Sequence, residues 1–197
     1  LLEDEGQRFE LELSPSTVGR LADYLAELDL WRRKVNLTGR LTPAELAAHV
    51  LESVLGSGLI AHGARVVDIG SGAGFPGLPL AIARQDLDVT LVEPRAKRCT
   101  FLRHVVRTLG LGNVRVIEAR IEEVGGQTFE VATTRAVGGF ADWLGDMPFL
   151  KGSGLVLAWA TDTRDLEGAL GGGFRLESAL PVPGSARKRI AAFRRTG

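Results

Sequence analysis

The chain has 197 residues, of which 45% are hydrophobic and 6% aromatic, a composition typical of a folded protein rather than a disordered one. Its 24 basic and 24 acidic residues give a formal net charge of zero, so total charge makes no case for nucleic-acid binding. No apolar run approaches the roughly 20 residues of a membrane span. The single cysteine, Cys99, excludes an internal disulfide and a multi-thiolate zinc site. We therefore expect a cytoplasmic protein with no membrane partner and no metal.

The basic residues are unevenly distributed along the chain. Between Arg95 and Arg120 a cluster of arginines and lysine is opposed by one acid, Glu118, and no acid follows Glu177. A chain that is neutral in sum can therefore present a basic face. Arginine outnumbers lysine, and its planar guanidinium suits phosphate and nucleic-acid bases, although a coding bias would give the same excess.

The first third of the sequence predicts helices. Ser14 followed by Pro15 is a helix-start signal, and apolar residues then recur at helical spacing as far as Leu28. A second helix is predicted from Thr42, because Thr42-Pro43-Ala44-Glu45 has the spacing of a capping box with proline at the first helical position. We expect residues 1–62 to form a helical extension in front of one compact Rossmann-like domain that spans residues 63–197.

From about residue 64 onward, short β-rich runs alternate with helical stretches, the clearest of which is 95–109. This alternation predicts a parallel sheet with right-handed crossovers. The last two runs flank the turn segment Pro181–Ser185, which predicts a hairpin. The seven expected strands are Arg65–Ile69, Val89–Glu93, Val114–Ile117, Phe129–Thr134, Gly154–Trp159, Phe174–Leu180 and Arg189–Arg194.

The strongest chemical signal is the glycine-rich loop that follows the first of these strands. It reads Gly70-Ser71-Gly72-Ala73-Gly74-Phe75-Pro76-Gly77, and a helix is predicted to follow it. Glycine lets the backbone turn tightly and approach a ligand closely. The next helix directs its free N–H groups and its positive dipole end at the same place. We therefore expect a ligand site at this loop.

Two ligands compete for the loop. Gly72–Gly77 matches the G-x-G-x-x-G fingerprint of dinucleotide sites, which is a weak signal by itself. Asp68 precedes Gly70 by two residues, where a carboxylate would repel a pyrophosphate but favour the ammonium and sulfonium of S-adenosylmethionine. Gly70 also extends the pattern to D-x-G-x-G-x-G, whereas Glu93, after the next strand, would bind ribose hydroxyls of either ligand. S-adenosylmethionine is favoured, and a dinucleotide or a ligand-free structural loop stays open.

Further stretches occur in the order typical of one family. They are Asn36-Leu37-Thr38, His49–Ser53, Phe75–Pro79, Lys97-Arg98 with Phe101–Arg103, Ala119–Glu123 and Thr134-Arg135-Ala136. On these residues the chain resembles the RsmG (GidB) family, the 16S ribosomal RNA guanine-527 N7-methyltransferases. The resemblance extends over roughly residues 31 to 140 and weakens beyond them, where Trp159-Ala160 stand in place of a Lys-Gly that the family often carries.

The resemblance implies a fold, a cofactor and a set of roles. The fold would be the α/β class I S-adenosylmethionine-dependent methyltransferase, whose seven-stranded, mostly parallel sheet has an antiparallel last strand. Gly70 and Phe75 would line the cofactor pocket, Ile121 and Glu122 would flank the adenine, and Arg135 would lie at the mouth of the active site. The expected cofactor-binding residues are Asp68, Gly70, Gly72, Gly74, Phe75, Glu93, Ile121, Glu122 and Arg135.

Methylation of guanine N7 needs no general base, because N7 carries a free lone pair. The sequence offers no convincing Ser/His/Asp or Cys/His set, which fits this chemistry. The reaction needs orientation, which arginine can provide through phosphate or O6. Arg120 and Arg135 are the expected catalytic residues, since both follow strands on the cofactor side of the sheet. The expected RNA contacts are Lys97, Arg98, Arg103, Arg187, Lys188 and Arg189, although those on the helix could instead coat a solvent-facing surface.

The function expected from these features is S-adenosylmethionine-dependent N7-methylation of a guanine in 16S ribosomal RNA. The substrate would be the RNA or the small ribosomal subunit, and the enzyme a monomer. One alternative keeps the fold but methylates a protein or small molecule; another is a non-catalytic module that holds a nucleotide. Trp31 and Trp143 are expected in the core, His49 as a structural residue, and His62 and His104 on the surface.

Overall fold

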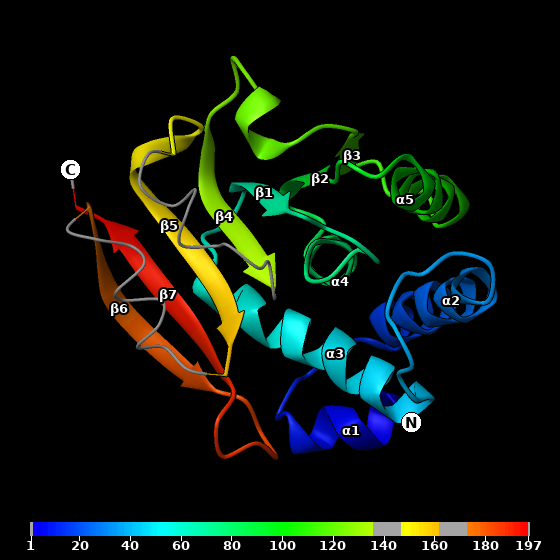
Figure 1. Ribbon diagram of the computed structural model, residues 1–197. Helices are drawn as coiled ribbons and strands as arrows, with labels where there is room; N and C mark the ends of the chain where they lie inside the picture. The colour runs from blue at the N-terminus through cyan, green and yellow to red at the C-terminus, as the bar shows by residue number, and fades with distance from the viewer. Residues whose placement is uncertain (1, 136–146, 162–172, 197) are drawn as a thin grey trace.

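The computed structural model describes residues 2–135, 147–161 and 173–196, and Trp143 lies outside these ranges. Seven strands form one sheet in the order β3-β2-β1-β4-β5-β7-β6 (Figure 1). The strands are β1 (Arg65–Ile69), β2 (Asp88–Val92), β3 (Val114–Ile117), β4 (Phe129–Arg135), β5 (Leu150–Ala160), β6 (Phe174–Pro181) and β7 (Arg189–Arg195). All seven predicted strands are therefore confirmed.

The direction of the strands also follows the prediction. Strands β1 to β5 pair in parallel, whereas β7 runs antiparallel between β5 and β6 and forms the predicted hairpin with β6. The largest difference in bounds is the start of β5, which begins at Leu150 rather than Gly154. Leu150 pairs with Phe129 across an irregularity in the register, and the exposed residues 151–153 between the two starts carry no apolar pattern.

The helical third of the chain begins where its caps predict. Ser14 accepts a hydrogen bond from the Thr17 N–H (3.1 Å), and Thr42 and Glu45 form a complete capping box. The helices are α1 (Leu2–Arg8), α2 (Pro15–Arg32), α3 (Pro43–Leu55), α4 (Gly77–Ala83) and α5 (Ala96–Thr108), with short 3-10 helices η1 (Gly56–Leu59) and η2 (Ile121–Glu123). None of the described helices combines the length and the apolar character of a membrane span.

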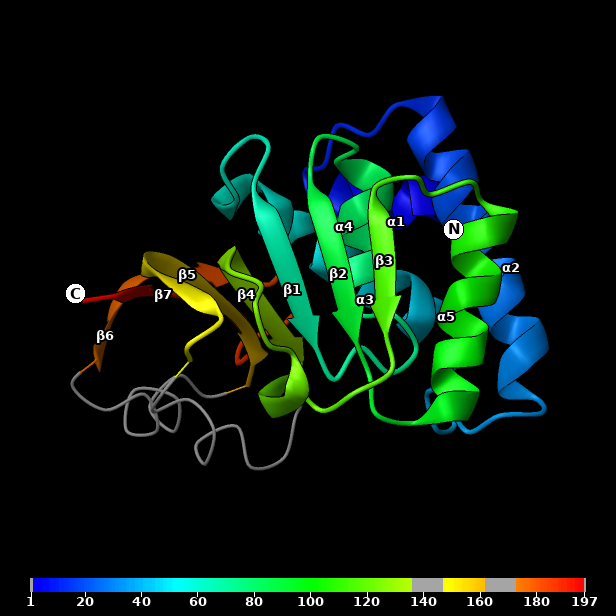
Figure 2. The ribbon, with the colours of Figure 1, turned by 90° about the horizontal axis from the view of Figure 1, so that it is seen from above.

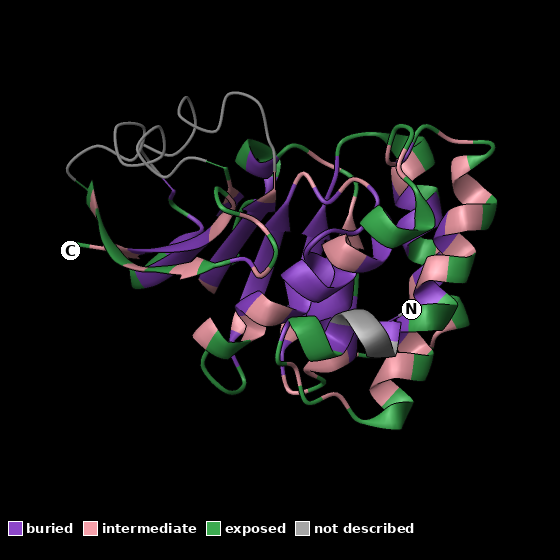
Figure 3. Ribbon diagram, turned by 90° about the horizontal axis from the view of Figure 1, so that it is seen from below, coloured by how far each residue is buried: buried purple, intermediate pink, exposed green. Residues whose placement is uncertain are grey.

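All five of these α-helices contribute to one hydrophobic core on a single face of the sheet (Figure 1). Tyr24 and Leu28 of α2 share this core with Val66 of β1 and Val89 of β2. In Figure 3 the middle strands are buried, whereas the outer sides of the helices at the right of the view are intermediate or exposed. The helices before residue 62 thus share one core with the sheet, and the division of the chain at residue 62 stays a prediction.

The parallel strands bring their carboxyl ends to one edge of the sheet. Figure 2 shows the arrowheads of β1, β2, β3 and β4 pointing to the same side. The glycine-rich loop follows β1 there, and α5 begins shortly after β2. Loops that follow parallel strands commonly form the binding site of an open α/β sheet, so a ligand site is expected at this edge.

Candidate active site

The glycine-rich loop crosses from the end of β1 over the end of β2. The backbone N–H groups of Gly70 and Ser71 both donate to the carbonyl of Val92, at 2.9 and 3.1 Å. Gly70, Gly72 and Gly74 have φ angles of 68°, 57° and 100°, which L side chains rarely adopt. The alternating glycines of the motif are therefore a conformational requirement of this turn.

Asp68 lies beneath this loop, not on its surface. It is fully buried and accepts hydrogen bonds from the Gly77 N–H (3.2 Å) and the Thr133 hydroxyl (3.0 Å). Burial raises the pKa of its carboxyl to about 6, although these hydrogen bonds oppose the rise. The protein's own groups thus surround the Asp68 carboxylate, and its expected role in cofactor binding stays a prediction. Asp68 ties the end of β1 to the start of α4.

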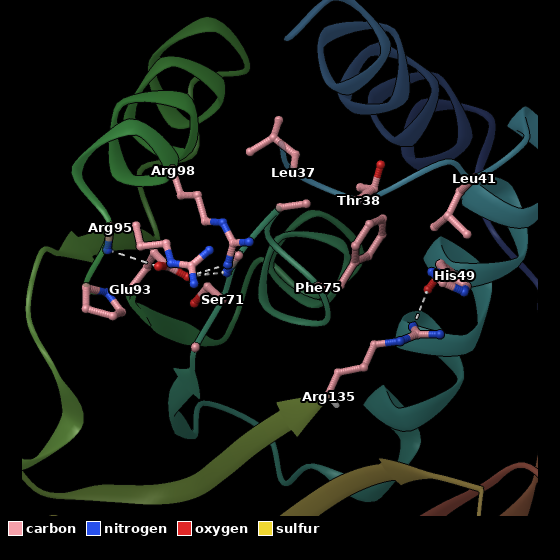
Figure 4. A pocket seen from close by; sticks show the side chains of 14 residues that line it. Leu37, Thr38, Leu41, His49, Ser71, Phe75, Glu93, Arg95, Arg98 and Arg135 are labelled. Carbon is pink, nitrogen blue, oxygen red and sulfur yellow. Dashed lines mark hydrogen bonds and ion pairs between the residues drawn. The ribbon is translucent and has the colours of Figure 1, made fainter. Parts of the chain in front are cut away.

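Glu93, after β2, faces the loop from the other side. Its carboxylate accepts from the Gly72 N–H (2.9 Å) and from the Arg95 N–H (3.0 Å), and Arg98 Nη1 lies 3.6 Å away (Figure 4). The Glu93 side chain is only 2% exposed, yet it lines a cavity at the sheet edge. A carboxylate has about four acceptor sites, so Glu93 keeps capacity for ligand hydroxyls.

The cavity measures about 520 Å³, within the size range of small-molecule sites. Its wall combines the loop, the end of β2, the start of α5, the segment between α2 and α3, and the last residue of β4 (Figure 4). The lining residues are Leu37, Thr38, Leu41, His49, Gly70, Ser71, Gly72, Ala73, Phe75, Glu93, Pro94, Arg95, Arg98 and Arg135. Of the predicted cofactor-binding residues, five lie on this lining: Gly70, Gly72, Phe75, Glu93 and Arg135.

Arg135 forms the end of the cavity opposite Glu93. Its guanidinium donates to the His49 carbonyl (3.2 Å), lies 5.9 Å from the centre of the Phe75 ring, and is ion-paired with Glu52. Glu52 also binds Lys188 Nζ at 2.7 Å. Burial raises the pKa of Glu52, but Arg135 and Lys188 outweigh burial and hold the pKa below its usual value. A buried, charged carboxylate thus fixes Arg135 in place.

Two further side chains at the site were not among the residues expected to form it. The imidazole of His49, expected to be only structural, lines the cavity with its ring at 89° to that of Phe75. Burial, together with nearby Arg135, lowers the pKa of His49 to about 4, so its ring is neutral near pH 7. The Tyr24 hydroxyl, buried in α2, donates to the Ala73 carbonyl at 2.8 Å and so attaches the helical extension to the loop.

Glu52 is the residue that sequence reasoning overlooked most clearly. It lies in α3 within a run of buried residues from Val50 to Val54 and is 4% exposed. An acid within a buried helical segment requires a cationic partner, which is a signal that the sequence did carry. The partners, however, come from β4 and from the turn before β7.

Five residues expected to be catalytic or to bind the cofactor lie apart from the cavity lining. Ile121 is buried in the core on the other face of the sheet, and Arg120 and Glu122 are exposed beside it at η2. Asp68 and Gly74 lie behind the loop surface rather than on it. The roles expected for Arg120, Ile121 and Glu122 stay predictions.

The residues expected to contact RNA divide into two groups. Arg98 turns into the cavity towards Glu93, and Lys188 reaches Glu52, because each of these buried carboxylates needs a cation. Both side chains are thus ion-paired with a buried acid while they stay partly exposed, and their expected contacts with RNA stay predictions. The others lie nearer the surface: Lys97 and Arg187 are exposed, Arg103 pairs with Glu118 at 2.9 Å, and Arg189 donates to the Lys188 carbonyl. Among the described residues no cluster of ligands suits a metal ion.

Known proteins resemble this chain in both sequence and fold. Ribosomal RNA small subunit methyltransferase G from Sorangium cellulosum is 44% identical over 154 residues, covering 74% of this chain and 64% of that protein. The protein of the same name from Desulfitobacterium hafniense is 38% identical over 194 residues, covering 95% and 79%. A ribosomal protein L11 methylase from Lactobacillus delbrueckii has a TM-score of 0.63 at 14% identity, covering 77% and 80%, and shares the fold alone.

The match to the Sorangium protein shows that the chain spans slightly less than two thirds of that relative's length. The sheet order and the structural neighbour confirm the expected class I methyltransferase fold. The family model described as rRNA small subunit methyltransferase G matches residues 18–167, which is more than half of the chain. This protein therefore belongs to the rRNA small subunit methyltransferase G family.

Proposed function

We propose that this protein transfers the methyl group of S-adenosylmethionine to N7 of a guanine in 16S ribosomal RNA. One observation carries the proposal: a single cavity holds the glycine loop with Glu93 at one end and a fixed arginine, Arg135, at the other. The first end has the groups that a nucleoside cofactor needs, and the second has a cation that can orient a guanine or its phosphate. The names of its relatives supply the substrate class.

The residues at the loop fit the proposed cofactor. When bound, S-adenosylmethionine supplies an electrophilic methyl group. Glu93 is placed to accept hydrogen bonds from ribose hydroxyls, and the Gly70–Ala73 backbone allows close approach because side chains are small or absent there. Buried Asp68 adds negative charge beneath the loop, which favours a cationic ligand without touching it. Ile121 and Glu122 are proposed at the adenine, because η2 follows β3 at the same sheet edge.

The Arg135 end fits a reaction that requires orientation and no base. Guanine N7 has a free lone pair, so no residue has to remove a proton. Arg135 can donate to guanine O6 or to a phosphate, and Glu52 holds its guanidinium in one position. Neutral His49 beside it offers a polar ring without adding a second positive charge. The proposed role of Arg135 is therefore positioning of the reacting nucleotide.

The remaining parts of the proposal concern partners and location. The RNA could be recognised free or within the small subunit, through the exposed cations Lys97, Arg103 and Arg187. A monomer in the cytoplasm is the simplest arrangement for such an enzyme.

The decisive experiment supplies tritiated S-adenosylmethionine with 16S RNA and with intact small subunits, and then maps N7-methylguanine at nucleotide resolution. We expect label at one guanine. Cofactor binding without label in either substrate would contradict the RNA assignment, and calorimetric binding of NADH in place of S-adenosylmethionine would contradict the cofactor.

A further inference from the structure

A second cavity lies beside the candidate active site, between the end of α2 and the first turns of α5. We call it the α2–α5 groove; it measures about 840 Å³. Its lining residues are Glu27, Leu30, Trp31, Arg33, Lys34, Val35, Lys97, Thr100 and His104. In Figure 2 the end of α2 and the start of α5 lie at the sheet edge to which the strand arrowheads point. The groove therefore opens on the same side of the molecule as the active-site cavity.

The wall of the groove is aromatic and apolar where it is open. The Trp31 indole packs with Phe101 at 5.7 Å and with the His104 ring at 5.1 Å, yet it keeps a partly exposed surface. Next to it, Leu30 is 58% exposed, the more exposed of the two large hydrophobic residues classed as exposed in the described ranges. The inner side of the Trp31 ring packs against Phe101 and His104. Its outer side and Leu30 form an apolar surface on which a planar base can stack.

The rim of the groove is cationic. Lys34 and Lys97 are both exposed, and within the described part of the chain neither forms an ion pair. Arg33 adds a third cation, 70% exposed and paired with Asp29. The one acid on the lining, Glu27, is engaged by His104 Nε2 at 2.8 Å. The charge around the groove thus complements a phosphate backbone rather than a basic or purely apolar partner.

The groove adjoins the active-site cavity. On α5, Lys97 lines the groove and its neighbour Arg98 lines the cavity. In the segment after α2, Val35 lines the groove and Leu37 lines the cavity. Figure 4 shows Leu37 and Arg98 on the same side of the cavity, Leu37 on the segment before α3 and Arg98 on α5. A strand whose reacting nucleotide occupies the cavity can therefore place a flanking nucleotide in the groove.

We propose that the α2–α5 groove binds an unpaired nucleotide of the RNA substrate. Its base stacks on Trp31 and Leu30, and its phosphates contact Lys34 and Lys97. The inference rests on the proposed function and extends it, because it assigns to the substrate a second binding position outside the methyl-transfer cavity.

The test uses a charge-reversed double variant, Lys34→Glu with Lys97→Glu. The matched control is Arg107→Glu with Arg175→Glu, which changes charge equally at exposed positions; Arg107 lies about 15 Å further along α5. Fluorescence anisotropy measures affinity for 16S RNA across a salt series, and calorimetry measures S-adenosylmethionine binding. We expect the groove variant to lose about tenfold or more in RNA affinity, with a salt slope lower by about 1.4 for two phosphate contacts. Its cofactor binding and the control's RNA affinity should stay at wild-type values.

A second measurement locates the RNA base on the protein. Cross-linking of 4-thiouridine-substituted 16S RNA should label the peptide that contains Leu30 and Trp31, and Trp31→Phe, which keeps an aromatic face, should retain RNA affinity. Wild-type affinity and salt slope in the groove variant, or cross-links only to other peptides, would overturn the inference while methylation by the wild type upholds the proposed function. Loss of association with a ribosomal protein but not with RNA would overturn it too. A wild type that neither binds nor methylates RNA would remove both proposals together.

Discussion

The two ends of the candidate active-site cavity are built in opposite ways. The glycine end is made of one continuous stretch, Asp68–Gly77, together with Glu93 from the neighbouring strand. The Arg135 end joins Glu52 to Arg135 across 83 positions of the chain and to Lys188 across 136. The first end depends on local backbone conformation, and the second on charges that meet only after folding. Substitutions should therefore damage the two ends in different ways.

The largest effect is expected at the glycine end. Gly72→Asp should abolish S-adenosylmethionine binding, because Gly72 has φ of 57° and the new carboxylate would stand beside Glu93. A Cβ at this position meets nothing closer than 3.7 Å, so strain and charge are the cause rather than overlap. Calorimetry measures the loss. Gly110→Asp, at a φ of 60° with nothing within 4 Å, should keep affinity, and equal loss there would show that the effect is general instability.

The next largest effect is expected at Arg135. Arg135→Lys should lower kcat/KM for RNA methylation by on the order of 10²-fold, because lysine lacks the planar fork that both Glu52 and a substrate oxygen can use. Binding of S-adenosylmethionine should change little, which separates the two ends of the cavity. Single-turnover kinetics and calorimetry provide the two readouts. Unchanged kcat/KM would exclude a role for Arg135 in positioning the substrate.

Glu52 and Glu130 offer a matched comparison of a buried and a partly exposed carboxylate, each at the centre of two ion pairs. Each carboxylate joins an arginine and a lysine, but the side chain of Glu52 is 5% exposed and that of Glu130 is 33% exposed. Glu52→Gln should reduce the free energy of unfolding by about 3–5 kcal/mol, since it leaves the largely buried Arg135 without its counter-charge. Glu130→Gln should cost about 1 kcal/mol or less.

Urea denaturation measures both values. Equal losses in the two variants would mean that burial of Glu52 does not increase the contribution of its ion pairs to the free energy of unfolding. In Glu52→Gln, methyl transfer should fall more than cofactor binding, because Arg135 loses its fixed position while the glycine loop is unchanged.

The smallest expected effect is a pH dependence from His49. Its pKa is about 4 in the folded protein against 6.5 for the free side chain, so between these values the unfolded chain binds the extra proton. Stability should therefore fall as pH decreases from 6.5 to 4. Asp68, with its pKa raised to about 6 from 3.8, acts in the opposite sense over much of the same range. The difference between wild type and His49→Gln isolates the histidine.

Thermal melting between pH 4 and 7 gives that difference. The gap in Tm between His49→Gln and wild type should shift in favour of the variant as pH decreases. A gap that is constant with pH would mean that His49 titrates normally in the folded protein.

The sequence predicted most of the fold because its signals are local. Parallel strands are buried on both faces and read as apolar runs, so β1 to β4 were located to within one residue at each end. The start of β5 was missed because the exposed residues 151–153 lack such a pattern. Side-chain partners were not predicted: Arg98 points to Glu93, since a buried acid attracts the nearest cation.

By itself the sequence determined the backbone of the ligand loop and the acid that faces it, because glycine spacing dictates φ and strand order places Glu93 alongside. Only the tertiary structure decided that Glu52, Arg135 and Lys188 form one charged unit and that Trp31 lines a basic groove. The physical reason is the distance along the chain over which each interaction acts. Backbone conformation depends on neighbouring residues, whereas the pairing of buried charges depends on distances that exist only when separate elements pack together.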